Sequence, residues 1–198
     1  MRSAKAGCRF STELLRTVCK RADIECFSVA PVFGAGSVRS FQVMPGVQLI
    51  YSQLELQAPT TRIYQLRSNM VEISFCLDGE MRIDTPEIQI CKGDTVILNQ
   101  THNHALCNFC GCPFLGVSLV IFFPEIVTTL NIMLGTLSFE KDEYLYKLLL
   151  QESGLVIGAQ GRIVQAFHEL RDLPENYNHY LTRLKTIELL LYIMGEMK

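Results

Sequence analysis

The sequence predicts an α+β protein in which an antiparallel β-barrel or sandwich is followed by a helical region. From residue 47 to residue 123, short alternating runs are broken by turn residues at roughly 8–12-residue spacing, which is typical of all-β folds. After Pro124 the apolar residues recur with a helical period. The 198 residues are 48% hydrophobic and 19% charged, which is enough apolar material for one sizeable core.

The first 40 residues are predicted to form a helix and a linker. Residues 10–27 place Ser11 where an N-cap belongs, and four side chains share one helical face: Leu14, Leu15, Val18 and Cys19. Residues 30–40 contain one proline and two glycines, which favours a loop.

The barrel is assigned to residues 41–123. Its clearest hairpin signal is Asp78-Gly79 between residues 71–77 and 80–83, because a type I′ turn favours this dipeptide. Lys92-Gly93-Asp94 predicts a second turn. The remaining predicted strands are 47–56, 62–66, 88–90, 95–98 and 114–123.

The helical region is assigned to residues 124–198. Pro124 suits the first turn of a helix that ends near Gly135, and Ser138 suits the cap of the next. A third helix is expected over 161–173 and a fourth from Asn178 onward.

Bulk composition excludes several classes of protein. The net charge is −2, and the first thirty residues carry a surplus of only +3, so the chain has no general attraction to nucleic acid. The longest apolar runs are about half of the roughly 18 residues that a membrane span needs. No hydrophobic segment of a signal peptide is visible. We therefore expect a cytoplasmic protein with no membrane partner.

Eight cysteines stand at positions 8, 19, 26, 76, 91, 107, 110 and 112. This density is well below that of disulfide scaffolds. We expect a reduced protein whose thiols are mostly buried.

Three segments together resemble the N-terminal regulatory half of AraC-type transcription regulators, in the group similar to the siderophore-responsive regulator PchR. They are VEISFCLDG (71–79), the Lys92-Gly93-Asp94 turn and KTIELLLY (185–192), and the resemblance covers about residues 45–198. It implies a cupin-like jelly roll that senses a small-molecule effector, followed by helices that mediate homodimerisation.

The resemblance also implies how such a protein acts on DNA. In the family, two helix-turn-helix motifs follow this region, and the present sequence stops at Lys198, where they would begin. No basic recognition helix is visible in the 198 residues. We expect DNA binding only through that absent C-terminal module.

The metal-binding motifs of cupins are only half present. Glu72 and Gly79 fit the first motif, but its histidines are replaced by Gln65 and Arg67, or by Leu66 and Ser68. The second motif retains Gly93, His104 and Asn108, whereas Asn99 and Thr101 replace its proline and glycine. Two ligand positions of four make a poor metal site. We therefore expect no metal cofactor and no enzymatic activity.

The residues 71–77 alternate between two faces. Val71, Ile73, Phe75 and Leu77 form an apolar face that must pack against another layer, such as the helices. The opposite face carries polar groups that suit a ligand pocket inside the barrel, unless it is simply solvated. The candidate ligand-binding residues are Arg62, Tyr64, Glu72, Ser74 and His104.

The segment 102–112 offers an alternative function. His102, His104, Cys107, Cys110 and Cys112 have spacing that suits zinc or an iron–sulfur centre, and hence a metal or redox sensor on the same scaffold. The simpler alternative is a hairpin whose cysteines serve as small apolar residues.

The last helix is too apolar for one contact surface. Five residues define a predicted dimer seam: Leu181, Leu184, Ile187, Leu191 and Met194. Leu189, Leu190 and Ile193 widen the apolar face, so the helix must be covered on two sides. A second copy would cover the seam; the alternative is coverage by the absent module.

No catalytic residues are assigned. The sequence has no Gly-x-Ser-x-Gly elbow, no phosphate-binding glycine loop and no His-Glu-x-x-His motif. The favoured function is an effector-sensing and dimerisation domain of a transcription regulator. The alternatives are the cysteine-based sensor and a metal-dependent cupin enzyme.

Overall fold

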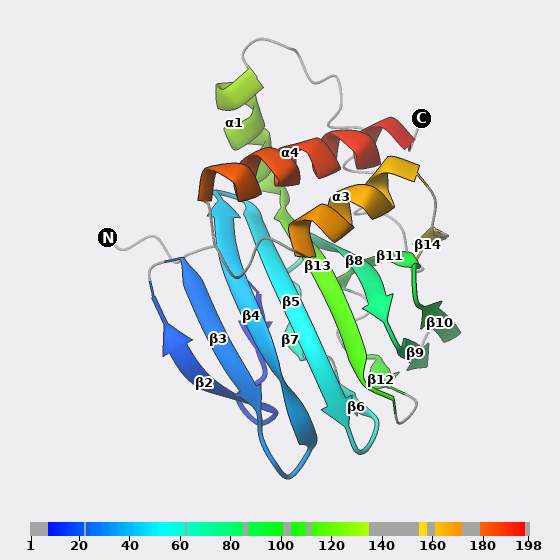
Figure 1. Ribbon diagram of the computed structural model, residues 1–198. Coiled ribbons are helices and arrows are strands. Elements are labelled where there is room, and N and C mark those ends of the chain that lie inside the picture. The colour runs from blue at the N-terminus through cyan, green and yellow to red at the C-terminus, as the bar shows by residue number, and fades with distance from the viewer. Residues whose placement is uncertain are drawn as a thin grey trace.

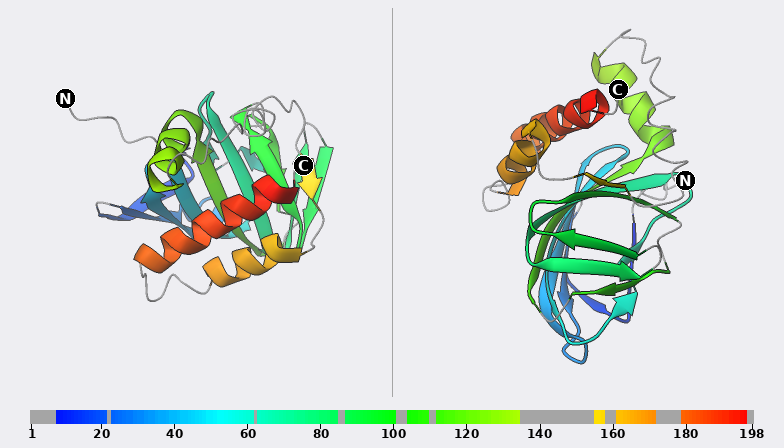
Figure 2. Two further views of the ribbon diagram at one scale, coloured as in Figure 1. Left: turned by 90° about the horizontal axis from the view of Figure 1, so that it is seen from above. Right: turned by 90° about the vertical axis from the view of Figure 1, so that its right-hand side faces the viewer.

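The computed structural model describes residues 8–21, 23–61, 63–84, 87–100, 104–109, 112–134, 155–157, 161–171 and 179–196. Figure 1 shows a large sheet with a smaller sheet on one face and helices on the other. In Figure 2 the strands curve around a common interior. The antiparallel barrel that the sequence predicts is confirmed.

The large sheet has eight strands, and every neighbouring pair in it is antiparallel. In sheet order they are β14 (Leu155–Ile157), β11 (Thr95–Asn99), β8 (Met70–Asp78), β13 (Phe114–Phe122), β5 (Val47–Leu56), β4 (Gly34–Met44), β3 (Ile24–Val29) and β2 (Leu15–Lys20).

Two smaller sheets close the other side of the barrel. One has four strands, in the order β10 (Glu87–Cys91), β9 (Glu80–Asp84), β12 (Leu106–Asn108) and β6 (Thr60–Thr61). The other pairs β1 (Arg9–Phe10) with β7 (Tyr64–Gln65).

The described residues after β13 contain three helices. They are α1 (Phe123–Leu134), α3 (Gly161–Arg171) and α4 (His179–Glu196). These bounds confirm three of the four predicted helices to within two residues; the helix predicted at Ser138 lies outside the described residues. None of the described helices is long and apolar enough to cross a membrane.

Two hydrophobic cores lie on opposite faces of the large sheet. One is shared with the small sheets and includes Ile50, Cys76 and Ile83. The other is shared with the helices and includes Phe75 and Phe167, whose rings stack with centroids 5.2 Å apart. The molecule is thus layered as helices, large sheet and small sheet.

Strand β8 takes part in both cores. Val71, Ile73, Phe75 and Leu77 all belong to the core on the helix side, as the sequence predicts. The intervening side chains point to the barrel interior, since neighbouring residues of a strand face opposite ways.

The hairpin predicted at Asp78-Gly79 is wrong. Strand β8 pairs with β11 and β13, whereas β9 pairs with β10 and β12 in the other sheet. Gly79 adopts φ +80°, and a Cβ there would lie 2.1 Å from the carbonyl oxygen of Pro113. The glycine therefore allows the chain to cross from one sheet to the other beside Pro113 rather than to fold back on itself. The turn at Lys92-Gly93-Asp94 is confirmed, and β11 follows it.

The helix predicted over residues 10–27 is also wrong, because these residues form β1, β2 and most of β3. Ser11 caps only a single turn, in which its Oγ accepts a hydrogen bond from the amide of Leu14 at 3.4 Å. Leu15, Phe27 and Val29 are buried in the core between the sheets. Tertiary packing and strand pairing outweigh the local helical spacing.

The linker predicted over residues 30–40 is largely strand β4. Gly34 and Gly36, which suggested a loop, have φ of 137° and 141°. A Cβ at either would lie 2.2 or 2.3 Å from a carbonyl oxygen of β5. Glycine here permits close approach of two strands. The proposed boundary at residue 40 therefore falls inside a strand of the large sheet.

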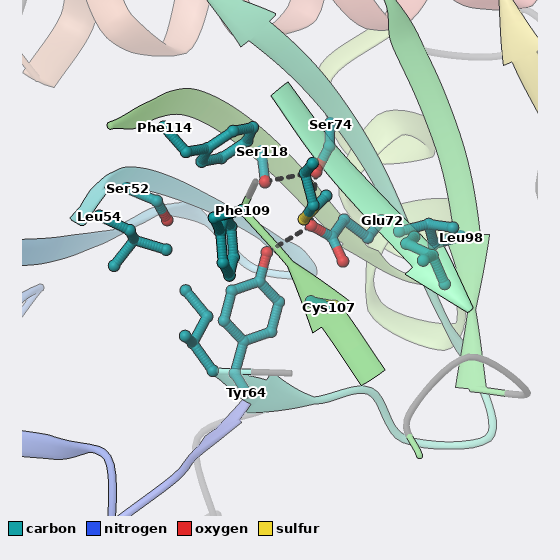
Figure 3. Close-up of a pocket in the computed structure, with 13 residues that line it drawn as sticks. Ser52, Leu54, Tyr64, Glu72, Ser74, Leu98, Cys107, Phe109, Phe114 and Ser118 are labelled. Atoms are coloured by element: carbon teal, nitrogen blue, oxygen red, sulfur yellow. Dashed lines mark hydrogen bonds between the residues drawn. The ribbon is translucent and has the colours of Figure 1, made fainter. Parts of the chain in front are cut away.

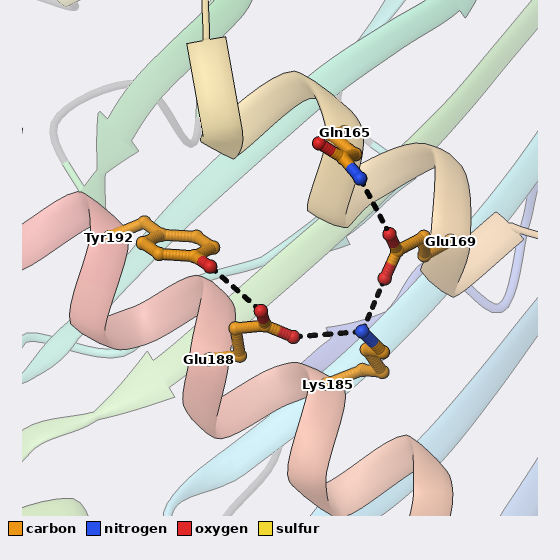
Figure 4. A network of polar contacts seen from close by, with 5 residues as sticks. All are labelled: Gln165, Glu169, Lys185, Glu188 and Tyr192. Atoms are coloured by element: carbon orange, nitrogen blue, oxygen red, sulfur yellow. Dashed lines mark hydrogen bonds and ion pairs between the residues drawn. The ribbon is translucent and has the colours of Figure 1, made fainter.

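Helices α3 and α4 lie side by side and are joined by a polar network (Figure 4). Lys185 forms ion pairs with Glu169 of α3 and with Glu188 of α4, the second at 2.9 Å. Gln165 and Tyr192 donate to these carboxylates at 3.0 and 2.7 Å. The network holds the two helices together as one layer.

Candidate functional site

A cavity lies inside the barrel, between the large sheet and the four-stranded sheet (Figure 3). The space between its lining atoms, with the open solvent at the mouth included, is about 470 Å³. Its lining residues are Ser52, Leu54, Ile63, Tyr64, Glu72, Ser74, Met81, Ile83, Leu98, Cys107, Phe109, Phe114 and Ser118.

The polar residues of this cavity form a chain of hydrogen bonds. The hydroxyls of Tyr64 and Ser74 both donate to Oε1 of Glu72, the second at 2.5 Å. Ser74 is also 2.6 Å from the hydroxyl of Ser118. These four residues, Tyr64, Glu72, Ser74 and Ser118, are called the polar chain below.

The protons of the polar chain can be placed from its connectivity. A serine hydroxyl has one proton and two acceptor lone pairs. Because Ser74 donates its proton to Glu72, Ser118 must donate to Ser74 across their shared contact. The hydroxyl protons of Tyr64, Ser74 and Ser118 are therefore all donated within the polar chain. The oxygen of Ser118 can still accept a hydrogen bond.

The polar chain is held by strands on different sides of the cavity. Glu72 and Ser74 stand on β8, and Ser118 stands opposite Ser74 on β13 in the strand register. Tyr64 reaches the carboxylate from β7, in the two-stranded sheet. The side chain of Glu72 is only 3% exposed. A buried carboxylate needs hydrogen-bond donors, and the two hydroxyls supply them.

Apolar side chains surround the polar chain on the other sides. Phe109 and Phe114 are both buried and lie with ring centroids 5.4 Å apart. Leu98 comes from β11 and Ile83 from β9. The described lining residues include no lysine, arginine or histidine. The described lining is thus mostly apolar, and its polar groups are the polar chain and the hydroxyl of Ser52, with the thiol of Cys107.

The five predicted ligand-binding residues separate into three groups. Tyr64, Glu72 and Ser74 come together in the polar chain. His104 is exposed and is not among the cavity lining. Arg62 lies outside the described residues. Whether the first three bind a ligand stays a prediction.

Ser52 and Ser118 also line the cavity, and neither was predicted from the sequence. Each is a buried polar residue in a strand with otherwise mostly buried neighbours. A lone serine at an inward position of an apolar strand is the signal that would have found them, because a buried hydroxyl needs a partner.

The cysteine–histidine segment does not assemble into a metal site among the described residues. Cys107 is buried in the cavity wall, whereas Cys112 and His104 are exposed. His102 and Cys110 lie outside the described residues. No group of three potential metal ligands occurs in the part of the chain that the structure describes.

The cupin metal position is also a poor fit to a metal. One carboxylate oxygen of Glu72 already accepts two hydroxyl hydrogen bonds, and His104 does not line the cavity. The donor set that faces the cavity is made of hydroxyls, one carboxylate and one thiol, which lacks the imidazoles of the cupin motif.

The expectation of mostly buried thiols is wrong for the described cysteines. Only Cys76 and Cys107 are buried, and the other five are partly or fully exposed. Burial raises the pKa of Cys76 to about 12. Cys19 and Cys26 lie in the strands that were predicted as a helix, and both are partly exposed.

The residues of the predicted dimer seam differ in how far they are exposed. Leu181, Leu184 and Leu191 are 39%, 64% and 46% exposed. Ile187 packs partly against the core on the helix side. The side chain of Met194 lies outside the described residues. The opposite face of α4 is buried through Leu189, Leu190 and Ile193.

Comparison with known proteins adds little to this picture. No family model matches the sequence, and no curated protein matches it. KdgF from Halomonas sp. is a solved structure with 13% identity, covering 59% of this chain and 94% of its own, at a TM-score of 0.34.

Two further solved structures are similar at the same level. A cupin protein from Bacteroides fragilis has 16% identity, covers 40% of this chain and 69% of its own, and has a TM-score of 0.34. An HTH_3 family transcriptional regulator from Vibrio cholerae has 12% identity, covers 43% of this chain and 51% of its own, and has a TM-score of 0.35. Similarities this low assign neither a family nor an activity.

The fold and the site together define a class of protein. It is an antiparallel β-barrel with an internal cavity and a helical layer on its outer face. This is the architecture that the cupin resemblance implies. The choice between a regulatory and an enzymatic role is not decided by the fold, so the expected lack of enzymatic activity stays a prediction.

Proposed function

We propose that this chain is the effector-sensing and dimerisation domain of an AraC-type transcription regulator. The observation that carries the proposal is the position of the cavity relative to the helices. Strands β5 and β8 line the cavity with one face and contact helix α3 with the other. A ligand in the cavity is therefore one strand away from the helical layer.

Two direct contacts link those strands to α3. Phe75 of β8 stacks on Phe167 of α3. The hydroxyl of Tyr51, on β5, donates to the backbone carbonyl of Leu170 at 2.6 Å. A ligand that favours one arrangement of β5 and β8 thus also favours one position of α3. Only such differential binding shifts a conformational equilibrium.

The ligand class follows from the chemistry of the cavity. The polar chain uses its own hydroxyl protons internally and presents acceptors, and the remaining wall is mostly apolar. The proposed effector is a small molecule with an apolar body and one hydrogen-bond-donating group, such as an amine or a hydroxyl. A carboxylate of the same shape would meet acceptors and bind less well.

Dimerisation is assigned to the exposed face of α4. Tyr180, Leu184 and Leu191 are 77%, 64% and 46% exposed and recur on one side of the helix, opposite its buried face. We propose that a second copy of the chain covers this face in a two-fold contact, because self-complementary apolar stripes suit that symmetry. The contact would place α3 and the cavity within reach of the dimer seam.

The ligand proposal is tested by thermal unfolding of the full 198-residue chain with three matched probes. They are 2-phenylethylamine, 2-phenylethanol and phenylacetate, at equal concentrations. The amine or the alcohol is expected to raise the unfolding temperature by a few degrees, and phenylacetate by less. A preference for phenylacetate, or no shift with any of the three, would contradict the proposed ligand class.

Two variants locate the binding. Glu72→Gln should remove most of the shift because it changes the centre of the polar chain. Glu55→Gln is the matched control, since Glu55 is exposed on strand β5 outside the cavity. Equal loss in both variants would place the ligand elsewhere.

The dimer proposal has its own test. Light scattering of the unmodified chain at micromolar concentration should give the mass of two copies, and Leu184→Glu should give the mass of one. A monomeric unmodified chain would overturn the dimer assignment without touching the cavity.

A further inference from the structure

The edge hairpin of the large sheet brings two cysteines together. Among the described strands, β2 is the last of that sheet and pairs only with β3. Cys19 of β2 stands directly opposite Cys26 of β3 in the antiparallel register. Side chains in such pairs have Cβ atoms roughly 4.5–5.5 Å apart, and disulfides need roughly 3.5–4.5 Å. A small local adjustment therefore suffices to join the two sulfurs.

The hairpin can make that adjustment. Its register shifts between Thr17 and Cys19, which marks an irregularity next to the pair. Bulges of this kind increase local twist and re-aim side chains. An edge strand is also held on one side only, so β2 can move without disturbing a further neighbour.

The two thiols already contact each other. Burial raises the pKa of the Cys26 thiol, and the charge of Cys19 and a side-chain hydrogen bond between the two sulfurs raise it further. Both cysteines are partly exposed, unlike Cys76 and Cys107. The pair is therefore accessible to small oxidants from solvent.

Cationic side chains lie beside the pair. Arg39 of β4 stands opposite Cys26 in the register of the next strand pair. The guanidinium groups of Arg39 and Arg21 act against the other influences and lower the pKa of Cys26. These cations only partly offset the rise in the pKa of Cys26, which suits a thiol that keeps its proton until it attacks an oxidised neighbour such as Cys19.

We propose that Cys19 and Cys26 form a redox-sensitive dithiol that a hydroperoxide converts reversibly into a cross-strand disulfide. The proposal is independent of the cavity and of the proposed regulatory function.

The reaction has two balanced steps. The Cys19 thiolate attacks the peroxide oxygen, the O–O bond breaks, and the leaving oxygen takes a proton and departs as water or an alcohol. Cys19 is then a sulfenic acid. Cys26 sulfur attacks that sulfur, the S–O bond breaks, and water leaves with the proton of Cys26. Two thiols are oxidised and one peroxide is reduced; two equivalents of a low-molecular-weight thiol reverse the change.

The two roles are assigned from the positions of the cysteines in the hairpin. Cys19 lies on the edge strand β2 between the exposed residues Val18 and Lys20, whereas Cys26 lies on β3, which is paired on both sides. Cys19 is therefore the group that attacks first, and Cys26 is the resolving group. A Cys26→Ser variant should therefore stop at the sulfenic acid of Cys19.

The test uses the full chain treated with stoichiometric hydrogen peroxide and then digested with trypsin without reduction. Cleavage at Arg16, Lys20, Arg21 and Arg39 separates the two cysteines onto peptides 17–20 and 22–39. We expect these two peptides to appear joined, with a loss of two hydrogen atoms, and to separate again after treatment with dithiothreitol.

Three variants make the result specific. Cys112→Ser, which removes an exposed cysteine elsewhere, should leave the joined peptide unchanged. Cys26→Ser should abolish it and yield a Cys19 adduct with dimedone, a probe for sulfenic acid. Cys19→Ser should abolish both products.

Two results would overturn the proposal. One is the absence of the joined peptide while peroxide oxidises other cysteines. The other is a joined peptide that involves Cys112 or Cys91 as often as Cys26, since that is the outcome of unselective oxidation of exposed thiols.

Discussion

The two faces of strand β8 differ in what they contribute. On the helix side, Val71, Ile73, Phe75 and Leu77 fill a continuous core with α3 and α4. On the barrel side, Glu72 and Ser74 line a cavity that is not filled by apolar side chains. The nine residues of β8 therefore provide packing on one face and a polar cavity wall on the other. Strand alternation separates the packed core from the cavity wall within a single element.

The largest expected effect lies on the packed face. Phe75→Ala removes a side chain that is 1% exposed and stacks on Phe167. We expect a loss of about 3–5 kcal/mol in the free energy of unfolding, from lost transfer energy and the cavity that remains. Urea unfolding measures it. A loss below about 1 kcal/mol would show that the helical layer is not packed on β8 as described.

A smaller effect is expected on the cavity face. Glu72→Gln changes the group that accepts two buried hydroxyl hydrogen bonds, so we expect a loss of about 1–2 kcal/mol in the free energy of unfolding. The same urea titration applies. If this variant costs as much as Phe75→Ala, the two faces of β8 do not divide stability from recognition.

A gain in stability is expected within the helical layer itself. The hydroxyl of Thr186 on α4 is fully buried and has no hydrogen-bond partner among the described residues. Thr186→Val keeps the shape and replaces the hydroxyl by a methyl group. Relative to the unmodified chain, Thr186→Val should raise the free energy of unfolding by about 1 kcal/mol. Thr186→Ala, which opens a cavity, is the comparison variant and should lower the free energy of unfolding. If Thr186→Val lowered the free energy of unfolding, the hydroxyl of Thr186 would have a hydrogen-bond partner in the folded protein.

The smallest effect concerns the polar network between α3 and α4. The ion pair with Lys185 lowers the pKa of Glu169 and of Glu188 below their ordinary value of 4.5. A lowered carboxyl pKa stabilises the fold fully above its ordinary value, and that contribution is lost as the pH falls through the lower folded value.

The contribution of the network is tested by measuring the unfolding temperatures of the unmodified chain and of the Lys185→Met variant at a series of pH values above and below 4.5. The difference between their unfolding temperatures should be constant above about pH 5 and should shrink as the pH falls below 4.5. High salt should also reduce it, because the charged groups are in partial contact with solvent. If the difference between the two unfolding temperatures grew on acidification, the ionised network would not stabilise the fold as described.

Much of the fold could be predicted where the local pattern and the tertiary structure agree. Residues 47–56 were predicted as a strand and form β5 with the same bounds. The apolar face of β8 was predicted to pack on the helices, and it does. Alternation with period two is a direct consequence of a strand with two distinct faces, so a single sequence reveals it.

The errors occur where pairing between distant segments decides the structure. Residues 15–20 became a strand because residues 24–29 and then 34–44 pair beside them. Gly79 became a crossing between sheets because Pro113, 34 positions later, lies against it. No local signal reports such partners, since β-propensity depends on neighbours that are remote in sequence.

The candidate site, like the fold, could be predicted in part from the sequence. Tyr64, Glu72 and Ser74 were named from strand alternation and meet in the polar chain. Ser118 completes the chain because β13 lies beside β8 in the sheet, and only the sheet order places it there. His104 was named from a motif position, and its loop places it at the surface instead.

The central claim, that the cavity communicates with the helical layer through β5 and β8, is tested most directly by amide hydrogen exchange. Exchange of the full chain is measured with and without saturating 2-phenylethanol or 2-phenylethylamine, whichever raises the unfolding temperature. The account predicts altered protection in α3 and α4 as well as in the strands that line the cavity. Protection changes confined to the cavity strands, with α3 and α4 unchanged at full occupancy, would contradict it.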